Sequence, residues 1–393
     1  MSSTDSWIWK VASPHPPLSP ERIESARRVH GDAVDEYLQH LQVGDPLADA
    51  LVKDFEQLPK GAGFELFVRA IGEGIGSIEN PPESLVAFFE QVDAVPDWVD
   101  WDRMSIASEK IINAGLLTGM AFALCALPHS YLANANAPLV FTRQLVDSTA
   151  HRYANTSRFV IESFMPGGLR RDSDGFRLAM IVRYMHAQVR KQIAESDDWD
   201  PTLGVPLNQA HLAMNNIFFS VYVMRGLSGL GVDFSAEERE SVMITWRYVA
   251  YLFGLDPRLI CATEVDANQL LQTAFSVEFD PNDASRLLSD AMMKAGPEYM
   301  KLRDERLGQV FITLLYPLSR LLLGDELANR LDYPPEKRRL MCFGFVRMVR
   351  LFERYPSLMP RSIRHWLGIE FWLDKSHYGE SDALKRSHAV QPK

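Results

Sequence analysis

The residues best suited to chemistry lie in one short segment, which places a histidine between two arginines. Arg183, His186 and Arg190 are three and four residues apart, so their side chains share one face if the segment is helical. Two fixed positive charges beside an imidazole favour its neutral form, which is the form that binds a metal. The arginines could hold carboxylates or propionates, which suggests a porphyrin iron site. They could equally form salt bridges to acidic residues elsewhere in the chain.

The helix that must position this histidine is marked by its apolar periodicity. Residues 176–193 carry apolar side chains at three- and four-residue intervals, which predicts an amphipathic helix. These side chains are Leu178, Val182, Met185, Val189 and Ile193. The preceding run Asp172-Ser173-Asp174 offers good capping chemistry for the helix start. A lone histidine on a helix is more often structural than a ligand, so the spacing alone does not decide its role.

A second polar group lies on a helix expected over about residues 138–165. Arg152 and Thr156 are four residues apart and share a face, and Ser163 follows beyond Phe159. A cation and a hydroxyl facing a cavity could stabilise bound oxygen or a developing anion. The alternative, which periodicity alone favours, is an exposed arginine and a threonine bonded to its own helix.

Composition restricts the class of protein. The chain has 393 residues, of which 47% are apolar, so it can bury a sizeable core and is not wholly disordered. Its net charge is −10 and it has no dense run of Lys or Arg, which argues against a nucleic-acid partner. Cys125, Cys261 and Cys342 are scattered in apolar surroundings, as expected for reduced, buried thiols. Because residues 1–10 lack the layout of a secretory signal, we expect a cytoplasmic protein.

Helix signals dominate the chain and period-two strand patterns are nearly missing, which predicts an all-α protein. We expect a single large helical domain over 21–373, with an N-terminal arm at 1–20 and a polar tail at 374–393. The uncharged stretch Ile111–Leu127 has 17 residues, whereas a membrane span needs about 20, so we predict a buried core helix and no transmembrane segment.

Two further helix starts are marked by their capping residues. Ser235 with Glu238 three residues on forms a capping box, and Asp280-Pro281 is expected to open another helix. The remaining helices are expected at about 46–58, 62–71, 82–91, 103–127, 206–229, 264–275, 301–324, 335–354 and 360–370.

Several common catalytic motifs are missing from the sequence. It contains no HExxH motif, no pair of Glu-x-x-His motifs, no P-loop, no GxGxxG after a strand and no GxSxG elbow. A helical protein with an isolated histidine is left, and haem iron is the most natural chemical partner for such a histidine.

The segment Arg183 to Arg190, RYMHAQVR, resembles the R-x-x-H-A-x-V-R signature of the rubber oxygenase, or latex clearing protein, superfamily. That superfamily also includes fungal oxygenases that cleave the prenyl tail of meroterpenoids. The upstream pair Arg152 and Thr156 is similar to the family's R-x-x-x-T element. The segments 204–209 and 246–254 also look family-like, and the resemblance covers about residues 95–275.

This resemblance implies an all-α, globin-like core that binds haem b. His186 would be the proximal ligand of the iron, and Arg183 and Arg190 would be structural or propionate-holding neighbours. Arg152 and Thr156 would lie on the oxygen-binding side. The implied reaction is cleavage of a carbon–carbon double bond in an isoprenoid-like substrate by O₂.

The sequence departs from the family pattern at positions that concern the reaction. The lysine that precedes the threonine in studied rubber-cleaving members is Asn155 here. Those enzymes also place a glutamate upstream, whereas Pro128 to Thr142 contains no acid and has Asn134 and Asn136 instead. Asparagine cannot accept a proton at neutral pH, so these residues cannot replace the glutamate as a base that removes an allylic proton.

We therefore expect a haem-dependent oxygenase that acts on a small hydrophobic molecule rather than on polyisoprene. A peroxidase or peroxygenase on the same haem, a haem-binding sensor or carrier without turnover, and a haem-free helical domain are the alternatives. His129, His151 and His211 are conceivable sixth ligands of the iron, although each is more often a structural residue.

Overall fold

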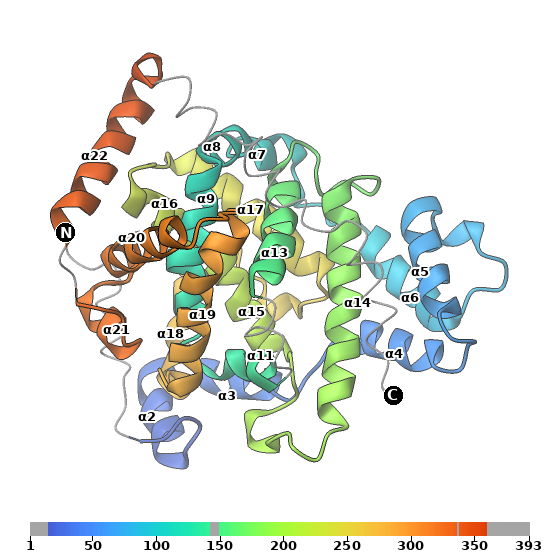
Figure 1. Cartoon of the computed structure of the whole chain (residues 1–393). Helices are drawn as coiled ribbons and strands as arrows, with labels where there is room; N and C mark the ends of the chain where they lie inside the picture. The colour runs from blue at the N-terminus through green and yellow to red at the C-terminus, as the bar shows by residue number, and fades with distance from the viewer. Residues whose placement is uncertain (1–14, 142–148, 336–337, 360–393) are drawn as a thin grey trace.

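The described part of the protein is built from helices joined by short turns. It is a computed structural model that describes residues 15–141, 149–335 and 338–359, and no strand occurs in these ranges. The all-α prediction is therefore confirmed, and one large apolar cluster runs through the helices (Figure 1). The proposed boundaries at 20 and 373 are not tested, because residues 1–14 and 360–393 lie outside the described ranges, as does the helix expected at 360–370.

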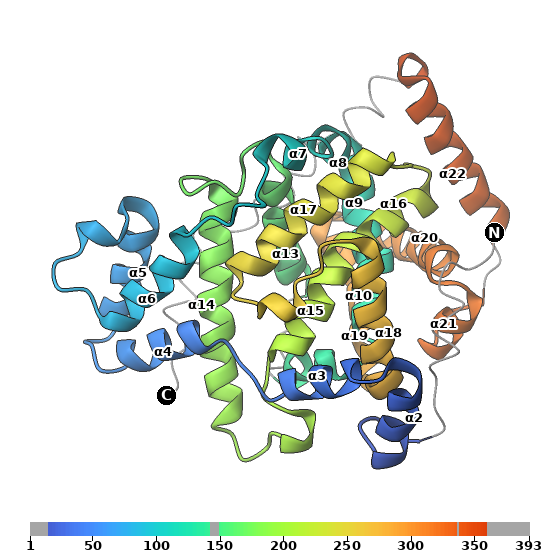
Figure 2. The same ribbon diagram turned by 180° about the vertical axis from the view of Figure 1, so that it is seen from behind.

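The N-terminal helices, here called the N-terminal flank, run along the bottom of the molecule and up its right-hand side in Figure 1. Together they comprise α2 (Pro20–His30), α3 (Ala33–His40), α4 (Pro46–Phe55), α5 (Ala62–Glu73) and α6 (Glu83–Asp93). The sequence did not mark α3 as a separate helix. Helices α4, α5 and α6 lie beside α14 (Asp174–Ala194), while α13 (Thr149–Phe164) packs on its other side (Figures 1 and 2). The histidine helix therefore stands between two groups of helices.

The central and C-terminal helices enclose the rest of the core. They are α15 (Gln209–Ile217), α16 (Val223–Leu230), α17 (Ala236–Leu252), α18 (Glu264–Glu278), α19 (Asp283–Tyr299), α20 (Glu305–Leu323), α21 (Asp325–Arg330) and α22 (Arg339–Arg354). The expected helix over 138–165 is described in two parts, α11 (Ala137–Phe141) and α13, and the residues between them lie outside the described ranges.

The expectation of one core helix over Ile111–Leu127 is wrong. The chain forms α7 (Trp101–Ser105), α8 (Ser108–Ala114), α9 (Leu116–Ala121), a π-helical segment Phe122–Ala126 and α10 (Leu127–Ser130). The direction changes by 93° at Gly115, whose φ of +44° is poorly accessible to other residues.

The expected burial of this stretch is confirmed, since Leu116, Leu117, Phe122 and Cys125 are all buried. No single helix in the described ranges has the length and apolar content to cross a membrane. The bent pair Trp101–Ala114 and Leu116–Ser130 meets that criterion only when both parts are combined.

A second π-helical segment, Phe218–Tyr222, joins α15 to α16 and packs against the first. The predicted helix over 206–229 is therefore present, but it contains a wider turn that apolar periodicity does not reveal.

Capping residues predict most helix starts well. Ser235 and Glu238 form the expected capping box of α17, and Ser173 caps α14. The start predicted at Asp280-Pro281 is two residues early, because Asn282 caps α19 and pairs with Ser285. All three cysteines are free; Cys125 and Cys342 are buried, whereas Cys261 is only partly buried.

Candidate functional site

Helix α14 buries its polar stripe more deeply than the apolar stripe that marks it in the sequence. Its buried residues are Gly175, Phe176, Ala179, Met180, Arg183, Tyr184, Ala187, Arg190 and Ile193. Of the apolar stripe, Ile193 alone is buried and Met185 is exposed. Both predicted arginines therefore lie in the interior, where an arginine must find compensating partners.

Arg183 is held by partners from three other helices. Its Nε donates to Asp45 Oδ2 at 2.6 Å and its Nη2 to Asp45 Oδ1 at 3.1 Å. Its Nη1 donates to Gln91 Oε1 at 2.6 Å and to the Leu252 carbonyl at 3.0 Å. The guanidinium also lies 4.4 Å from the centre of the Phe88 ring. Arg183 therefore joins α14 to the start of α4, to α6 and to the end of α17.

Two features of the surroundings fit this arrangement. Asp45 is also the N-cap of α4, where its side chain accepts a hydrogen bond from the Ala48 amide. Gly254 has a φ of +69°, and a Cβ there would lie 2.2 Å from Arg183 Nη2. The bidentate pair thus leaves no room for a side chain at Gly254.

Arg190 is also paired, but less completely. Its Nη1 donates to Asp49 Oδ1 at 2.5 Å and its Nη2 to the Leu207 carbonyl at 3.0 Å. Its Nε is buried without a hydrogen-bond partner in the described chain. Burial raises the pKa of Asp49 in spite of the nearby guanidinium. Arg190 therefore keeps one buried donor that protein groups do not satisfy.

His186 lies between these arginines and faces the interior. Burial, followed by the charges of Arg190 and Arg152, lowers the pKa of His186 to about 4, and Asp45 acts in the opposite direction. Its ring packs edge-on against Phe253, with centroids 5.9 Å apart. Neither ring nitrogen has a hydrogen-bond partner within the described residues. The imidazole is therefore neutral near pH 7, and its nitrogens are available to a ligand.

The accessible surface of His186 indicates what it faces. The side chain is only partly buried, yet desolvation is the largest influence on its pKa. The imidazole therefore lies among protein atoms that desolvate it, while part of its surface stays uncovered by the described residues.

Arg152 lies on α13, the helix that packs against the other side of α14. The guanidinium is half-buried, and burial lowers the pKa of Arg152 while Tyr131 opposes this effect. In the described ranges no hydrogen bond or ion pair of the guanidinium is found. Because its charge lowers the pKa of His186, Arg152 lies within electrostatic reach of the imidazole. The fold thus brings together two residues that the sequence separates.

Thr156 lies one turn along α13 from Arg152 and is also half-buried. Its Oγ1 donates to the Arg152 carbonyl at 2.9 Å. Thr156 therefore makes the bond to its own helix that the sequence predicted as the alternative to a role in the site. Ser163 makes the same kind of bond to the Phe159 carbonyl at 2.7 Å. The Thr156 oxygen can still accept a hydrogen bond, since a hydroxyl has two acceptor lone pairs.

The other candidate histidines occupy different surroundings. His211 Nε2 lies 3.0 Å from Glu278 Oε1, and its Nδ1 lies 3.1 Å from Asn208 Nδ2, which commits both nitrogens to protein groups. His129 Nδ1 lies 2.8 Å from the Cys125 carbonyl, and its ring packs on Tyr222 at 4.5 Å. His151 is half-buried on α13 next to Arg152. Of these three histidines, only His151 is a sequence neighbour of Arg152.

The asparagines that replace expected family residues are placed as follows. Asn136 is buried and donates from Nδ2 to the Tyr131 carbonyl at 2.7 Å. Asn134 and Asn155 are half-buried. The carboxylate whose charge acts on His186 is instead Asp45, and that group is committed to Arg183.

Sequence reasoning missed Asp45, Asp49, Gln91 and Phe253. The first three lie far upstream of α14, and no local pattern links them to it. The one available signal was Asp45-Pro46, since an aspartate directly before a proline is a common helix start. It predicts the cap of α4 but not its arginine partner.

The family model described as "ER-bound oxygenase mpaB/B'/Rubber oxygenase, catalytic domain" matches residues 113–352. The match spans more than half of the chain, so the chain belongs to this family of oxygenases and is an oxidoreductase. No curated protein matches the chain. A solved structure of latex clearing protein in the closed state is similar to it, with a TM-score of 0.65 and 18% identity. The similarity covers 89% of this chain and 90% of that one, which shows a shared helical fold.

Proposed function

We propose that this protein is a haem-b-dependent oxygenase that uses O₂ on a small hydrophobic substrate, such as an alkene or an isoprenoid. The observation that carries the proposal is His186, a desolvated, neutral imidazole that makes no hydrogen bond to any described residue. Membership of the oxygenase family supports the reaction class.

The residues present fit a haem group. His186 would supply a nitrogen ligand to the iron, since a neutral imidazole is the form that ligates iron. The unsatisfied Nε of Arg190 and the unpaired guanidinium of Arg152 are donors for propionate oxygens or for an oxygen-derived anion. Arg183 is committed to Asp45, so its part is to hold α14 in place. When bound, haem would supply the iron that activates O₂.

The chain's own groups prepare this site in three ways. The low pKa of His186 keeps its lone pair free near neutral pH. Phe253 packs against the edge of the ring and restricts its rotation. On α13, Arg152 offers a positive charge that is only partly solvated, so its interaction with a developing negative charge is stronger than in water.

An absorption spectrum of the purified protein tests the cofactor. We expect a Soret band that disappears in His186→Ala, while His30→Ala keeps it. His30 is a suitable control because it is a partly buried helical histidine on α2, on the N-terminal flank, and burial also lowers its pKa. A stoichiometric Soret band in a folded His186→Ala protein would falsify the ligand assignment.

Oxygen consumption tests the reaction. The haem-loaded protein should take up O₂ with at least one member of a panel of apolar alkenes, and Arg152→Gln should slow this uptake. Haem binding without uptake would favour a second candidate function, a haem-based sensor or carrier. That candidate draws support from Asn155 and from the Thr156 hydroxyl, whose proton is used within its own helix.

A further inference from the structure

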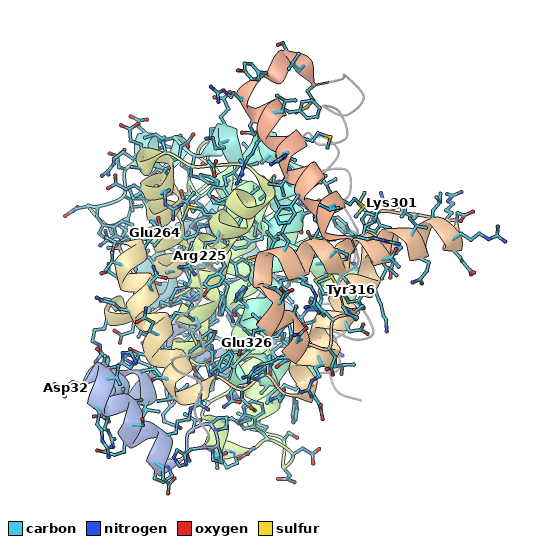
Figure 3. All side chains as sticks on the ribbon, turned by 90° about the vertical axis from the view of Figure 1, so that its left-hand side faces the viewer. Asp32, Arg225, Glu264, Lys301, Tyr316 and Glu326 are labelled. Atoms are coloured by element: carbon cyan, nitrogen blue, oxygen red, sulfur yellow. The ribbon has the colours of Figure 1, made fainter. Side chains whose placement is uncertain are left out.

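Helix α22 lies at the edge of the molecule and is covered on one side only. It packs on α16 and α20 through Cys342, Val346 and Val349, which are buried. Figures 1 and 2 show it extending past the body of helices. In Figure 3, which looks onto this side, it rises above α20, the helix that carries the labelled Tyr316.

The uncovered side of α22 is apolar. Leu340 is 88% exposed, Leu351 46%, Met341 44% and Met348 37%, and Tyr355 follows directly after the helix at 47%. With about 100° between successive residues, these five side chains fall within a single arc of about 100°. They form a continuous stripe, the α22 stripe, in which every side chain keeps more than a third of its surface exposed.

A row of positive charge borders the α22 stripe. Arg347, Arg350 and Arg354 are exposed, and helical spacing places them between the α22 stripe and the buried face. Residues 338–354 contain five arginines and one acid, Glu353, in a chain whose net charge is −10. This segment is thus basic, although the protein as a whole is acidic.

We propose that α22 docks the protein on an anionic membrane surface. The α22 stripe would enter the boundary between headgroups and acyl chains, and the bordering arginines would meet lipid phosphates. Charge complementarity selects this occupant: an arginine-rich helix is attracted to anionic lipid. A second copy would bring the same arginine row toward itself and meet like-charge repulsion. Docking would also place the enzyme where hydrophobic substrates partition, although it does not depend on the bound cofactor.

Co-sedimentation of the full chain with vesicles tests the proposal. The vesicles contain about three parts phosphatidylcholine to one part phosphatidylserine, with pure phosphatidylcholine as the uncharged reference. We expect binding to the mixed vesicles, weaker binding to the reference and weaker binding at high salt. Failure of the full chain to bind mixed vesicles overturns the proposal. Because neither haem nor O₂ enters this measurement, that failure leaves the oxygenase proposal intact.

Surface variants identify the face that binds. The double variant Leu340→Glu/Leu351→Glu should lose vesicle binding, and Arg347→Gln/Arg354→Gln should weaken it roughly fivefold for each arginine. The matched control is Val29→Glu/Val265→Glu, since these residues are 74% and 64% exposed on α2 and α18. Equal loss in the control, or no loss in the α22 variants, contradicts the proposed surface.

Cysteine labelling distinguishes the membrane from other occupants. Leu351→Cys should react readily with a water-soluble maleimide in the free protein and become protected when mixed vesicles are added. Protection in the free monomer would show that another segment of the chain covers the α22 stripe. Protection that grows with protein concentration would show that a second copy covers it. Either result overturns the proposal.

Discussion

Arg183 and Arg152 lie on adjacent helices and are both enclosed by the fold, but only the charge of Arg183 is paired with a described acidic residue. Arg183 is buried and bound to Asp45, Gln91 and a main-chain carbonyl. Arg152 has no such partner in the described chain, and burial lowers the pKa of Arg152 although Tyr131 opposes this effect. A paired buried cation resists removal, because its partner is then left charged and unpaired. A buried cation without a partner is stabilised when an anionic ligand binds beside it.

The family match separates the proposed site from the groups that pair with the arginines of α14. His186, Arg152 and Arg183 lie within the matched residues 113–352, whereas Asp45, Asp49 and Gln91 lie outside them. The groups proposed to meet a ligand therefore come from the catalytic-domain segment. The groups that neutralise the α14 arginines come from the N-terminal flank, so that flank contributes to the site by fixing α14.

The largest expected effect is on stability, in Arg183→Met. Removing the guanidinium leaves Asp45 buried and unpaired, which typically costs about 3–5 kcal/mol of unfolding free energy. Urea denaturation of the ligand-free protein measures this. Asp45→Asn should be similarly costly, and combining the two changes should cost less than their sum. A loss below about 1 kcal/mol would show that the Arg183–Asp45 pair does not hold α14 in place.

The second effect is a pH dependence of stability that originates at His186. Its pKa is about 4 in the folded protein and about 6.5 when unfolded, so below pH 6.5 the unfolded chain binds the additional proton. Stability should therefore fall as the pH decreases from 6.5 to 4, by up to about 3 kcal/mol from this residue. Denaturation curves of wild type and His186→Phe across this range isolate the contribution. Parallel curves would show that the imidazole is not desolvated.

The third effect separates the two arginines directly. Arg152→Gln should change the unfolding free energy by less than about 1 kcal/mol, or increase it, because no ion pair is lost. Cyanide affinity of the haem-loaded protein should fall about tenfold, which corresponds to roughly 1.4 kcal/mol. The pKa of His186 in the ligand-free protein should rise, which NMR titration can follow. Destabilisation comparable to that of Arg183→Met would show that Arg152 is a structural cation after all.

The smallest effect is expected at Thr156. Its hydroxyl donates to a carbonyl of its own helix, so Thr156→Val should cost less than about 1 kcal/mol of stability. If its oxygen also accepts a hydrogen bond at the site, cyanide affinity should fall a few-fold, and Thr156→Ser should restore it. Affinity unchanged in both variants would restrict Thr156 to the local bond.

The sequence predicted those parts of the site that depend on local spacing. The limits of α14 were predicted to within about two residues, because Ser173 caps the helix and the periodicity is continuous. The shared stripe of Arg183, His186 and Arg190 was also correct. Which arginine is paired was not predictable, since Asp45 is 138 residues from Arg183 and only packing brings them together. The break at Gly115 was missed because an uncharged run looks the same whether the chain continues straight or turns.

The two π-helical segments, Phe122–Ala126 and Phe218–Tyr222, have a consequence for insertions and deletions. Each holds one residue more than an ordinary turn, so deleting a single residue would restore a regular α-helix. The same deletion would leave the helix downstream in nearly its present orientation, because the wide turn absorbs the extra residue locally. His129 and Met224, now buried just beyond the two segments, would therefore keep their orientation, and the change would fall on the segments themselves. Because the segments pack against each other, we expect that neither can be removed alone. Their lengths are therefore constrained as a pair, although no pattern in either stretch of sequence indicates this.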